Sequence, residues 1–267
     1  MRSHRLHRLI GYLVIVIILF FATETQRTQR EDVEIVFQPQ ITQINPYQDE
    51  YEKMLYPTVR ISTPSGTGSG VIISHRDTEK YIYILSASHV VGNENKVTIE
   101  LFYPKNIKID ADVVITDTTK DLVLLRITNP PQSPFDKGGR KGGFYNATLA
   151  PKDYTPYLFS PVWAVGCSLG LKPRPSFGHI TAINEQLAIN NAQFSLLTAQ
   201  CPFWEISSPI LPGNSGGPVY DARTFEVIGI AVWVKVYQYQ LVTTMAGVVP
   251  IQTIYEFLNH KDTKNTK

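Results

Sequence analysis

The sequence is poor in the residues that define several specialised protein classes. It has only two cysteines, Cys167 and Cys201, among 267 residues. In an oxidising compartment these could form one disulfide, and two free thiols in a core are an equally good interpretation. No cysteines and histidines follow the spacing of a metal site, so we expect neither structural zinc nor a cofactor.

An excess of charge of one sign is also missing. The chain carries 25 Lys and Arg against 23 Asp and Glu, a formal net charge of +2. Because the body of the chain contains no dense basic run, nothing indicates a nucleic acid partner. With 43% hydrophobic and 18% charged residues, the composition is that of a folded globular protein.

Long hydrophobic runs are absent except at residues 9–22, which follow Arg2, Arg5 and Arg8. A basic segment followed by an apolar one is the pattern of an export signal. The run is shorter than the about 20 residues of a spanning helix, but no small-x-small cleavage site follows it. A cleaved signal peptide, an uncleaved signal-anchor and a buried N-terminal helix therefore all stay open. Export would place the body in the periplasm or outside the cell, with residues 9–22 as a possible anchor in the inner membrane.

The remaining chain divides into three parts. Residues 23–56 are rich in polar and charged side chains, and we interpret them as a stalk or arm ahead of a domain at 57–267. Residues 129–145 are dense in proline and glycine, which predicts a surface-loop insertion. At the end of the domain, Pro250 and the helical spacing of Ile251, Ile254 and Leu258 predict a helix over 250–260.

Short β-branched runs separated by turn residues predict an all-β fold. Val97, Ile99 and Leu101, for example, alternate with polar residues, as in a half-buried strand. We expect six strands in a first barrel, about 57–128, and six in a second, about 150–250, because closing each set removes its exposed edges. The predicted strands are 58–62, 69–74, 81–86, 96–102, 107–115 and 122–128, then 162–165, 179–183, 193–199, 218–221, 226–232 and 243–249.

A glycine-dense turn, Gly213-Asn214-Ser215-Gly216-Gly217-Pro218, is the most informative motif. Glycine permits the backbone angles and close approaches that let one hydroxyl project while backbone N–H groups converge. A serine nucleophile needs such donors for the oxyanion that it creates. It also needs a histidine base, and a carboxylate that orients the base.

The best candidates for these two groups are His89 and Asp121. His89 follows an apolar strand through three small residues, and Asp121 directly precedes the apolar run 122–125. Each residue taken alone would be an ordinary structural one, a satisfied core histidine or a strand-start aspartate. Together with the serine motif they predict a triad of His89, Asp121 and Ser215.

The three blocks resemble those of the chymotrypsin-fold, trypsin-like serine proteases, most closely the bacterial HtrA/Deg group. The blocks are 85–89, 121–125 and 213–218, in the order His, Asp, Ser, and supporting matches lie at 66–71, 164–170, 226–230 and 246–250. The resemblance spans about residues 57–258. An α/β-hydrolase nucleophile elbow would need its acid and histidine after the serine, where only His260 occurs.

The resemblance implies a serine endopeptidase that forms an acyl-enzyme, with two six-stranded antiparallel barrels meeting at the active site. It implies an oxyanion hole at Gly213, Asn214 and Ser215. The residue six before the serine, Pro209, would lie at the floor of the specificity pocket, and Val232, Trp233 and Val234 would form the substrate-pairing strand. Pro209 offers no carboxylate to bind a Lys or Arg side chain. Val234 would narrow the pocket at a position where members of the family often have glycine. We therefore expect cleavage after small or aliphatic residues.

The sequence departs from the HtrA pattern in two respects. Too few residues follow Pro250 for a PDZ domain, and the loop at 129–144 has no counterpart in the family. We therefore expect no PDZ-linked sensing, and a homo-oligomer such as a trimer only through the N-terminal arm. Protein or peptide substrates are the expected partners. Two other interpretations stay open, a catalytically silent protease-like binding module and a structural protein of the cell envelope.

Overall fold

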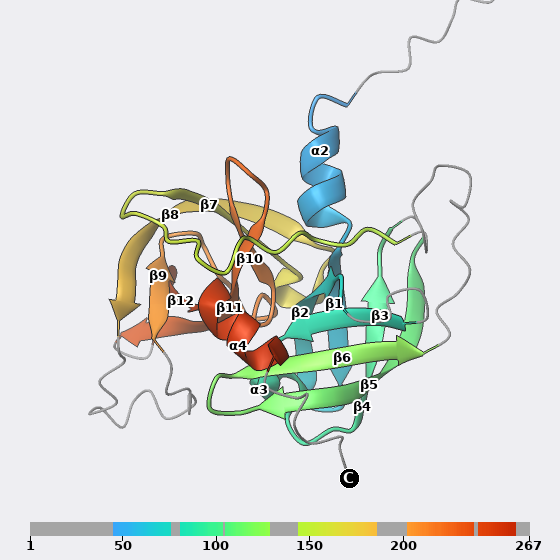
Figure 1. The fold of residues 1–267 in the computed structure, drawn as a ribbon. Coiled ribbons are helices and arrows are strands. Elements are labelled where there is room, and N and C mark those ends of the chain that lie inside the picture. The colour runs from blue at the N-terminus through green and yellow to red at the C-terminus, as the bar shows by residue number, and fades with distance from the viewer. Residues whose placement is uncertain are drawn as a thin grey trace, which may run out of the picture. The chain divides into compact units, whose positions relative to one another are not determined.

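The computed structural model describes residues 45–75, 81–103, 105–128, 144–185, 202–237 and 240–259. In this part of the chain, twelve strands form two closed antiparallel barrels of six strands each, followed by a short C-terminal helix (Figure 1). The predicted fold class is thereby confirmed. The predicted N-terminal signal and most of the 129–145 insertion lie outside the described residues.

The first barrel has the strand order β1-β2-β3-β6-β5-β4. Its strands are β1 (Thr58–Thr63), β2 (Gly66–Ile73), β3 (Tyr81–Ser86), β4 (Lys96–Leu101), β5 (Ile107–Asp117) and β6 (Leu122–Thr128). The side chains of Val97, Ile99 and Leu101 are buried in its core, as their alternation predicts. A short helix, α3 (Ser88–Val91), follows β3.

The second barrel has the order β10-β11-β12-β9-β8-β7. Its strands are β7 (Pro161–Gly166), β8 (Arg174–Glu185), β9 (Phe203–Ile206), β10 (Pro218–Asp221), β11 (Val227–Tyr237) and β12 (Gln240–Pro250), with a 3-10 turn, η3 (Ser168–Gly170), after β7. The strand predicted at 193–199 falls outside the described residues. The strand that lies between β8 and β12 is instead β9, which sequence analysis did not predict.

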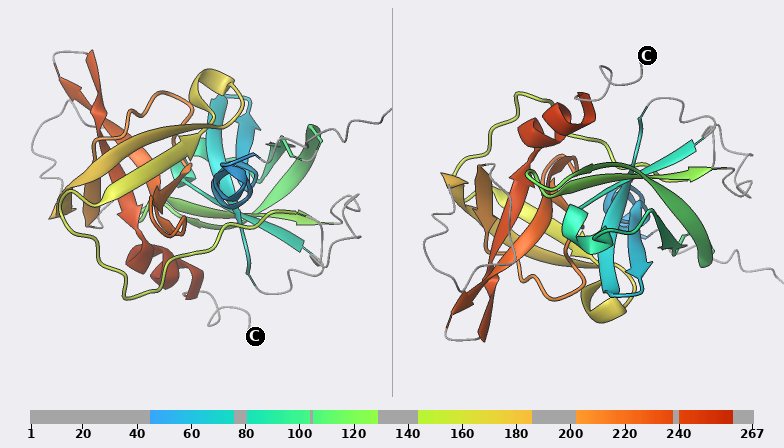
Figure 2. Two further views of the ribbon diagram at one scale, coloured as in Figure 1. Left: turned by 90° about the horizontal axis from the view of Figure 1, so that it is seen from above. Right: turned by 90° about the horizontal axis from the view of Figure 1, so that it is seen from below.

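The two barrels pack against each other through β1 and β2 of the first and β7 of the second (Figures 1 and 2). Residues from both contribute to one hydrophobic cluster, which includes Val71 and Leu85 of the first barrel and Val165 and Val219 of the second. Burial of this apolar surface holds the barrels in contact. The interface therefore brings β2 and β3 close to the loop that precedes β10.

The folded domain begins before Pro57, within the segment interpreted as an arm. Helix α2 (Gln48–Glu50) continues directly into η2 (Tyr51–Leu55). Met54 is 3% exposed and belongs to the shared hydrophobic cluster, and its carbonyl accepts hydrogen bonds from the hydroxyls of Thr58 and Tyr220. The last turn of the predicted arm is thus anchored to the domain.

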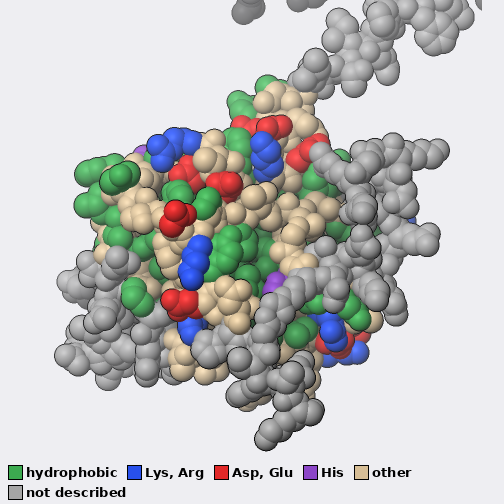
Figure 3. Space-filling model, viewed as in Figure 1, with side chains coloured by type: hydrophobic (Ala, Val, Ile, Leu, Met, Phe, Trp, Pro, Cys, Tyr) green, Lys and Arg blue, Asp and Glu red, His purple; other side chains and the backbone are tan. Residues whose placement is uncertain are grey.

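The predicted C-terminal helix is present as α4 (Ile251–Asn259), which packs against β11 and β12. Ile251, Ile254 and Phe257 form its buried face. Among the described residues, no helix has the length and apolar character needed to cross a membrane. On the face shown in Figure 3, acidic and basic side chains are interspersed, so neither sign of charge dominates it.

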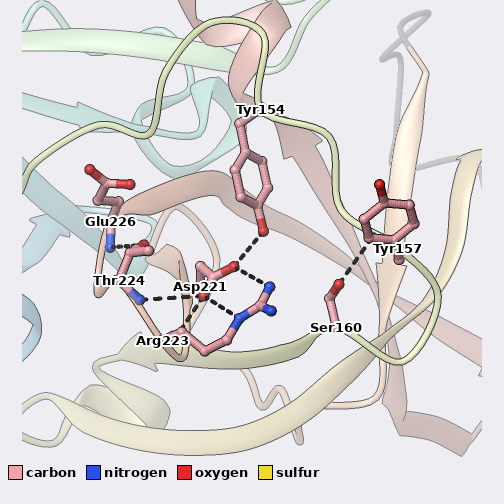
Figure 4. A network of polar contacts seen from close by, with 7 residues as sticks. All are labelled: Tyr154, Tyr157, Ser160, Asp221, Arg223, Thr224 and Glu226. Carbon is pink, nitrogen blue, oxygen red and sulfur yellow. Dashed lines mark hydrogen bonds and ion pairs between the residues drawn. The ribbon is translucent and has the colours of Figure 1, made fainter.

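A buried carboxylate organises the turn between β10 and β11 (Figure 4). Asp221 is 1% exposed. It accepts hydrogen bonds from the Tyr154 hydroxyl at 2.7 Å and from the Arg223 backbone N–H at 2.8 Å. Burial alone would raise the pKa of Asp221, but these bonds and the Arg223 guanidinium outweigh it and hold the pKa below its ordinary value.

We expect Tyr154→Phe to lower the free energy of unfolding by about 2 kcal/mol at neutral pH, because a hydrogen bond to a charged group is lost. Since the pKa of Asp221 is depressed in the folded state, the stabilisation is complete above the unfolded pKa, about 4, and is lost as the pH falls through the folded value. The difference between wild type and variant in urea unfolding should therefore shrink in acid. Tyr157→Phe is the matched control, because Tyr157 is 80% exposed. Equal losses for the two variants would contradict the account.

Candidate active site

Asp121 directly precedes β6, and it is 3% exposed. Its carboxylate is held on both oxygens. Oδ1 accepts the Ser88 hydroxyl at 2.7 Å and the His89 backbone N–H at 3.0 Å, while Oδ2 lies 2.7 Å from His89 Nδ1. Asp121 also has a positive φ of 52°, which is a strained conformation for a residue other than glycine. Strain of this kind concentrates at functional sites, and here it aims a buried carboxylate at an imidazole.

The sequence of β3 places His89 beside that carboxylate. Ser86 ends the strand, and α3 begins two residues later, so His89 lies on the first turn of the helix. Its side chain is 37% exposed, so one edge of the ring faces Asp121 while part of the ring stays accessible. Of the other histidines, His75 packs edge-on against Tyr83 and His179 against Phe177. His4, His7 and His260 lie outside the described residues.

The loop that carries Ser215 abuts the start of α3. Gly213 and Gly216 have φ values of +96° and +81°, which favour glycine because a β-carbon would clash. A β-carbon on Gly216 would overlap Ser86 Oγ and lie 2.9 Å from the Ala87 nitrogen. The residue after the serine therefore packs on the two residues that precede the histidine helix. The structure thus places the loop of Ser215 beside the start of the helix that carries His89, and His89 contacts Asp121, although the three residues are far apart in the sequence.

Backbone hydrogen bonds fix the serine loop to its surroundings. Gly216 donates to the Ala231 carbonyl at 2.7 Å, and Ala231 donates back to Gly217 at 2.9 Å. The N–H of Asn214, which sequence analysis included in the oxyanion hole, donates to the Leu211 carbonyl at 3.0 Å. This donor is already occupied. A pair of donors at Gly213 and Ser215 fits the geometry better than a set of three.

The residues predicted to bind substrate lie on two connected segments. Pro209 is exposed, between the buried Ser208 and Ile210. The Ile210 N–H donates to the Thr243 carbonyl of β12 at 2.8 Å, which ties this segment to the strand that pairs with β11.

On β11 itself, Val232 is buried and Val234 is half-buried, while Trp233 pairs with Gly247. The β11–β12 register shifts on either side of this stretch, between Ala231 and Trp233 and again after Val234. Its pairing with β12 is therefore irregular where substrate is expected.

A thiol near the loop is not a rival nucleophile. Cys167 is free and fully buried, and burial raises its pKa to about 12. The thiolate, which is the reactive form, is therefore scarce at neutral pH. Cys201 lies outside the described residues. Within the described ranges, no group of three or more metal-ligating side chains occurs.

Sequence analysis missed three serines that support the site. Ser88 donates to the carboxylate of Asp121, Ser86 packs on Gly216, and Ser69 donates to the carbonyl of Gly213. Ser86 and Ser88 lie within three residues of His89 in the sequence, so their proximity could have indicated that they support the site. The role of Ser69 depends on a contact across 144 residues of sequence, which no local pattern reveals.

A family model described as "Trypsin-like peptidase domain" matches residues 68–230. Among curated proteins, "Serine protease HtrA-like" from Staphylococcus epidermidis is 27% identical over 205 residues, which cover 74% of this chain and 32% of that protein. "Probable periplasmic serine endoprotease DegP-like" from Pseudomonas fluorescens is 29% identical over 165 residues, 61% of this chain and 28% of that protein. The chain thus spans about a third of the length of these relatives.

Solved structures with the same fold include "HtrA-type protease AlgW with tripeptide". It superposes with a TM-score of 0.60 at 21% identity, covering 80% of this chain and 64% of the other. At 21% identity, this structural similarity shows the fold alone.

Proposed function

The chain belongs to the trypsin-like peptidase domain family, and from this premise we propose that it is a serine endopeptidase with Ser215 as the nucleophile. The observation that carries the proposal is the 2.7 Å contact between His89 Nδ1 and the buried Asp121 carboxylate, with the Ser215 loop packed against the start of the histidine helix. A structural histidine would need neither a buried carboxylate nor a glycine-rich loop at its side.

The hydrogen bonds of Asp121 specify the tautomer of His89. An ionised carboxylate only accepts hydrogen bonds, so Nδ1 carries a proton toward Oδ2 and Nε2 is left as the acceptor. In the proposed reaction, Nε2 takes the Ser215 proton while Oγ forms a bond to the scissile carbonyl carbon. The imidazolium then gives that proton to the leaving amine as the carbon–nitrogen bond breaks. A water molecule, activated in the same way, releases the acyl group and restores the serine.

The oxyanion of each tetrahedral intermediate needs donors aimed at it beforehand. We assign this role to the backbone N–H groups of Gly213 and Ser215. Loss of one such donor generally costs about 2.7–4 kcal/mol of transition-state stabilisation. This is why the conformation of the loop matters as much as the identity of its serine.

We expect the preferred substrates to carry a small or aliphatic residue before the scissile bond. Pro209 supplies no carboxylate that could pair with Lys or Arg. The side chain of Val234 would narrow the specificity pocket, where a glycine would leave it open. A proteome-derived peptide library, digested with the protein and sequenced at its new termini, measures this preference. Dominant cleavage after Arg or Lys would refute the assignment of these pocket residues, while leaving the triad untouched.

We further propose that the substrates are proteins and that the domain lies outside the cytoplasm. The basic and apolar N-terminal pattern supports export, and the relative from Pseudomonas fluorescens is named as periplasmic. Membrane attachment through residues 9–22 and self-assembly through the N-terminal arm stay predictions from the sequence.

A further inference from the structure

Ser69 is a fully buried serine on β2 at which four segments of the chain meet. Its hydroxyl donates to the Gly213 carbonyl at 2.6 Å and accepts the Cys167 N–H at 2.8 Å. One hydroxyl of the first barrel therefore joins the end of β7 to the loop that carries the nucleophile, both of which belong to the second barrel.

The backbone of Ser69 extends this connection. Its N–H donates to the Ser215 carbonyl at 2.8 Å, and its carbonyl accepts the Ser86 hydroxyl at 2.6 Å. Ser86 stands just before the helix of His89. All three polar groups of Ser69 are thus engaged, and they hold the serine loop at Gly213 and at Ser215 itself.

The hydrogen bond to the Pro212 carbonyl determines the direction in which the Gly213 N–H points, because the two groups belong to one peptide unit. The Leu169 N–H donates to the Pro212 carbonyl at 2.7 Å. Because a peptide unit is planar and trans, the Gly213 N–H must point to the opposite side from Leu169. Glycine has little conformational preference of its own, so a peptide next to it could otherwise turn over. With the Pro212 carbonyl held by Leu169 and the Gly213 carbonyl held by Ser69, the peptide units on both sides of Gly213 are fixed.

The turn that anchors Pro212 is itself held from the first barrel. Leu169 lies in η3 with a φ of +54°, a left-handed conformation that leucine rarely adopts. Arg60 of β1 donates to the Gly170 carbonyl in the same turn and pairs with Glu100 of β4. A strained turn of this kind persists only where its surroundings over-determine it. Here those surroundings include Arg60 of the first barrel and Pro212 of the serine loop.

We propose that Ser69 is a positioning residue of the oxyanion hole. Its hydroxyl fixes the peptide unit that follows Gly213, while Leu169 fixes the preceding unit, which carries the Gly213 N–H. By holding the second side of this flexible residue, Ser69 limits the rotation through which the Gly213 N–H could turn away from the developing oxyanion. Donors fixed in advance need no reorganisation during the reaction, which is the source of their large catalytic effect. The inference rests on the proposed peptidase function, and it adds a cross-barrel contact on which that function depends.

The test compares Ser69→Ala with Ser160→Ala in the full chain. Ser160 is a suitable control because it too is a buried serine, 6% exposed, whose hydroxyl holds one backbone group, the Tyr157 N–H. Steady-state kinetics on a peptide from the cleavage profile separate kcat from KM, and circular dichroism checks the fold. A displacement of about 1 Å at a reacting group can cost 10²-fold. We therefore expect kcat of Ser69→Ala to fall about 10- to 100-fold with KM within about twofold, and both constants of Ser160→Ala to stay at the wild-type values.

The possible results separate this inference from the function on which it rests. An active wild type together with an unchanged kcat in Ser69→Ala, or a change in KM alone, would overturn the positioning role and leave the peptidase proposal standing. A wild type that hydrolyses no peptide would overturn both. If Ser69→Ala fails to fold, Ser69→Cys replaces it, because a thiol is a weak hydrogen-bond donor. A lowered kcat in Ser69→Cys at constant KM supports the role, and a wild-type kcat refutes it.

Discussion

Ser215→Ala is expected to lower kcat for peptide hydrolysis by about 10⁶-fold, the loss typical when the nucleophile of a triad is removed. Alanine keeps the backbone of the loop, so the proposed oxyanion donors at Gly213 and residue 215 and the contacts of Gly216 with Ser86 remain. The residual rate would come from substrate binding and from these donors alone. Kinetics on a fluorogenic peptide, with the variant purified away from any wild-type protein, give the measurement.

The matched control for this variant is Ser65→Ala, which removes a hydroxyl from the exposed turn between β1 and β2. It should keep the wild-type kcat. Both variants should also keep the circular dichroism spectrum of the parent. If Ser215→Ala retained most of the activity, the nucleophile would lie elsewhere. Wild-type protein without any activity would instead favour a silent, protease-like binding module.

Asp121→Asn is expected to lower kcat by about 10⁴-fold although it changes the shape of the side chain very little. In the structure, Oδ1 accepts two donors, the Ser88 hydroxyl and the His89 N–H. The amide oxygen of asparagine must take this position, since an NH₂ group there would face two donors. Its NH₂ group then faces His89 Nδ1, which must act as an acceptor. The ring proton moves to Nε2, and the base toward Ser215 is lost.

A second aspartate provides the control for this change. Asp117 ends β5 and accepts hydrogen bonds from Thr119 and Lys120 in the turn that precedes β6. Asp117→Asn should keep kcat within about twofold, although it weakens that turn. Equal kcat values for the two variants would contradict the tautomer argument. An Asp121→Asn protein that had unfolded would be recognised by its circular dichroism. Ser88→Ala would then replace it, because this variant keeps the Asp121 side chain and removes only one of its donors, and its kcat should fall far less than about 10⁴-fold.

Much of the fold was predictable because most of its strands are apolar, β-branched runs separated by turns. The bounds predicted for β3, β6 and β10 agree with the structure. The prediction began β8 too late, at residue 179 instead of Arg174, since Pro175 and Gly178 are unusual in strands. At Pro175 β8 pairs only with β7, so the missing N–H costs no bond to β9. Gly178 is required because a β-carbon there would overlap the backbone of Ser208.

The remaining differences come from contacts that no local pattern encodes. β9 follows Pro202 and has only four residues, too few to show a recognisable alternation of apolar and polar side chains. Its place in the barrel depends on pairing with β8 and β12. The helix at 48–55 lies in a polar segment, yet Met54 is drawn into the core. At the site, the residue types and their order pointed to His89, Asp121 and Ser215. The supporting serines become visible only when the two barrels are in contact.

The central claim is that one serine hydroxyl, activated by His89 and Asp121, is the reactive group of this protein. Mass spectrometry after incubation with a fluorophosphonate tests it most directly, because this reagent phosphonylates activated serines. The account predicts one adduct per molecule, located on Ser215 by peptide mapping, absent from Ser215→Ala and strongly slowed in Asp121→Asn. An adduct on another residue, or folded wild-type protein that remains unlabelled, would contradict it.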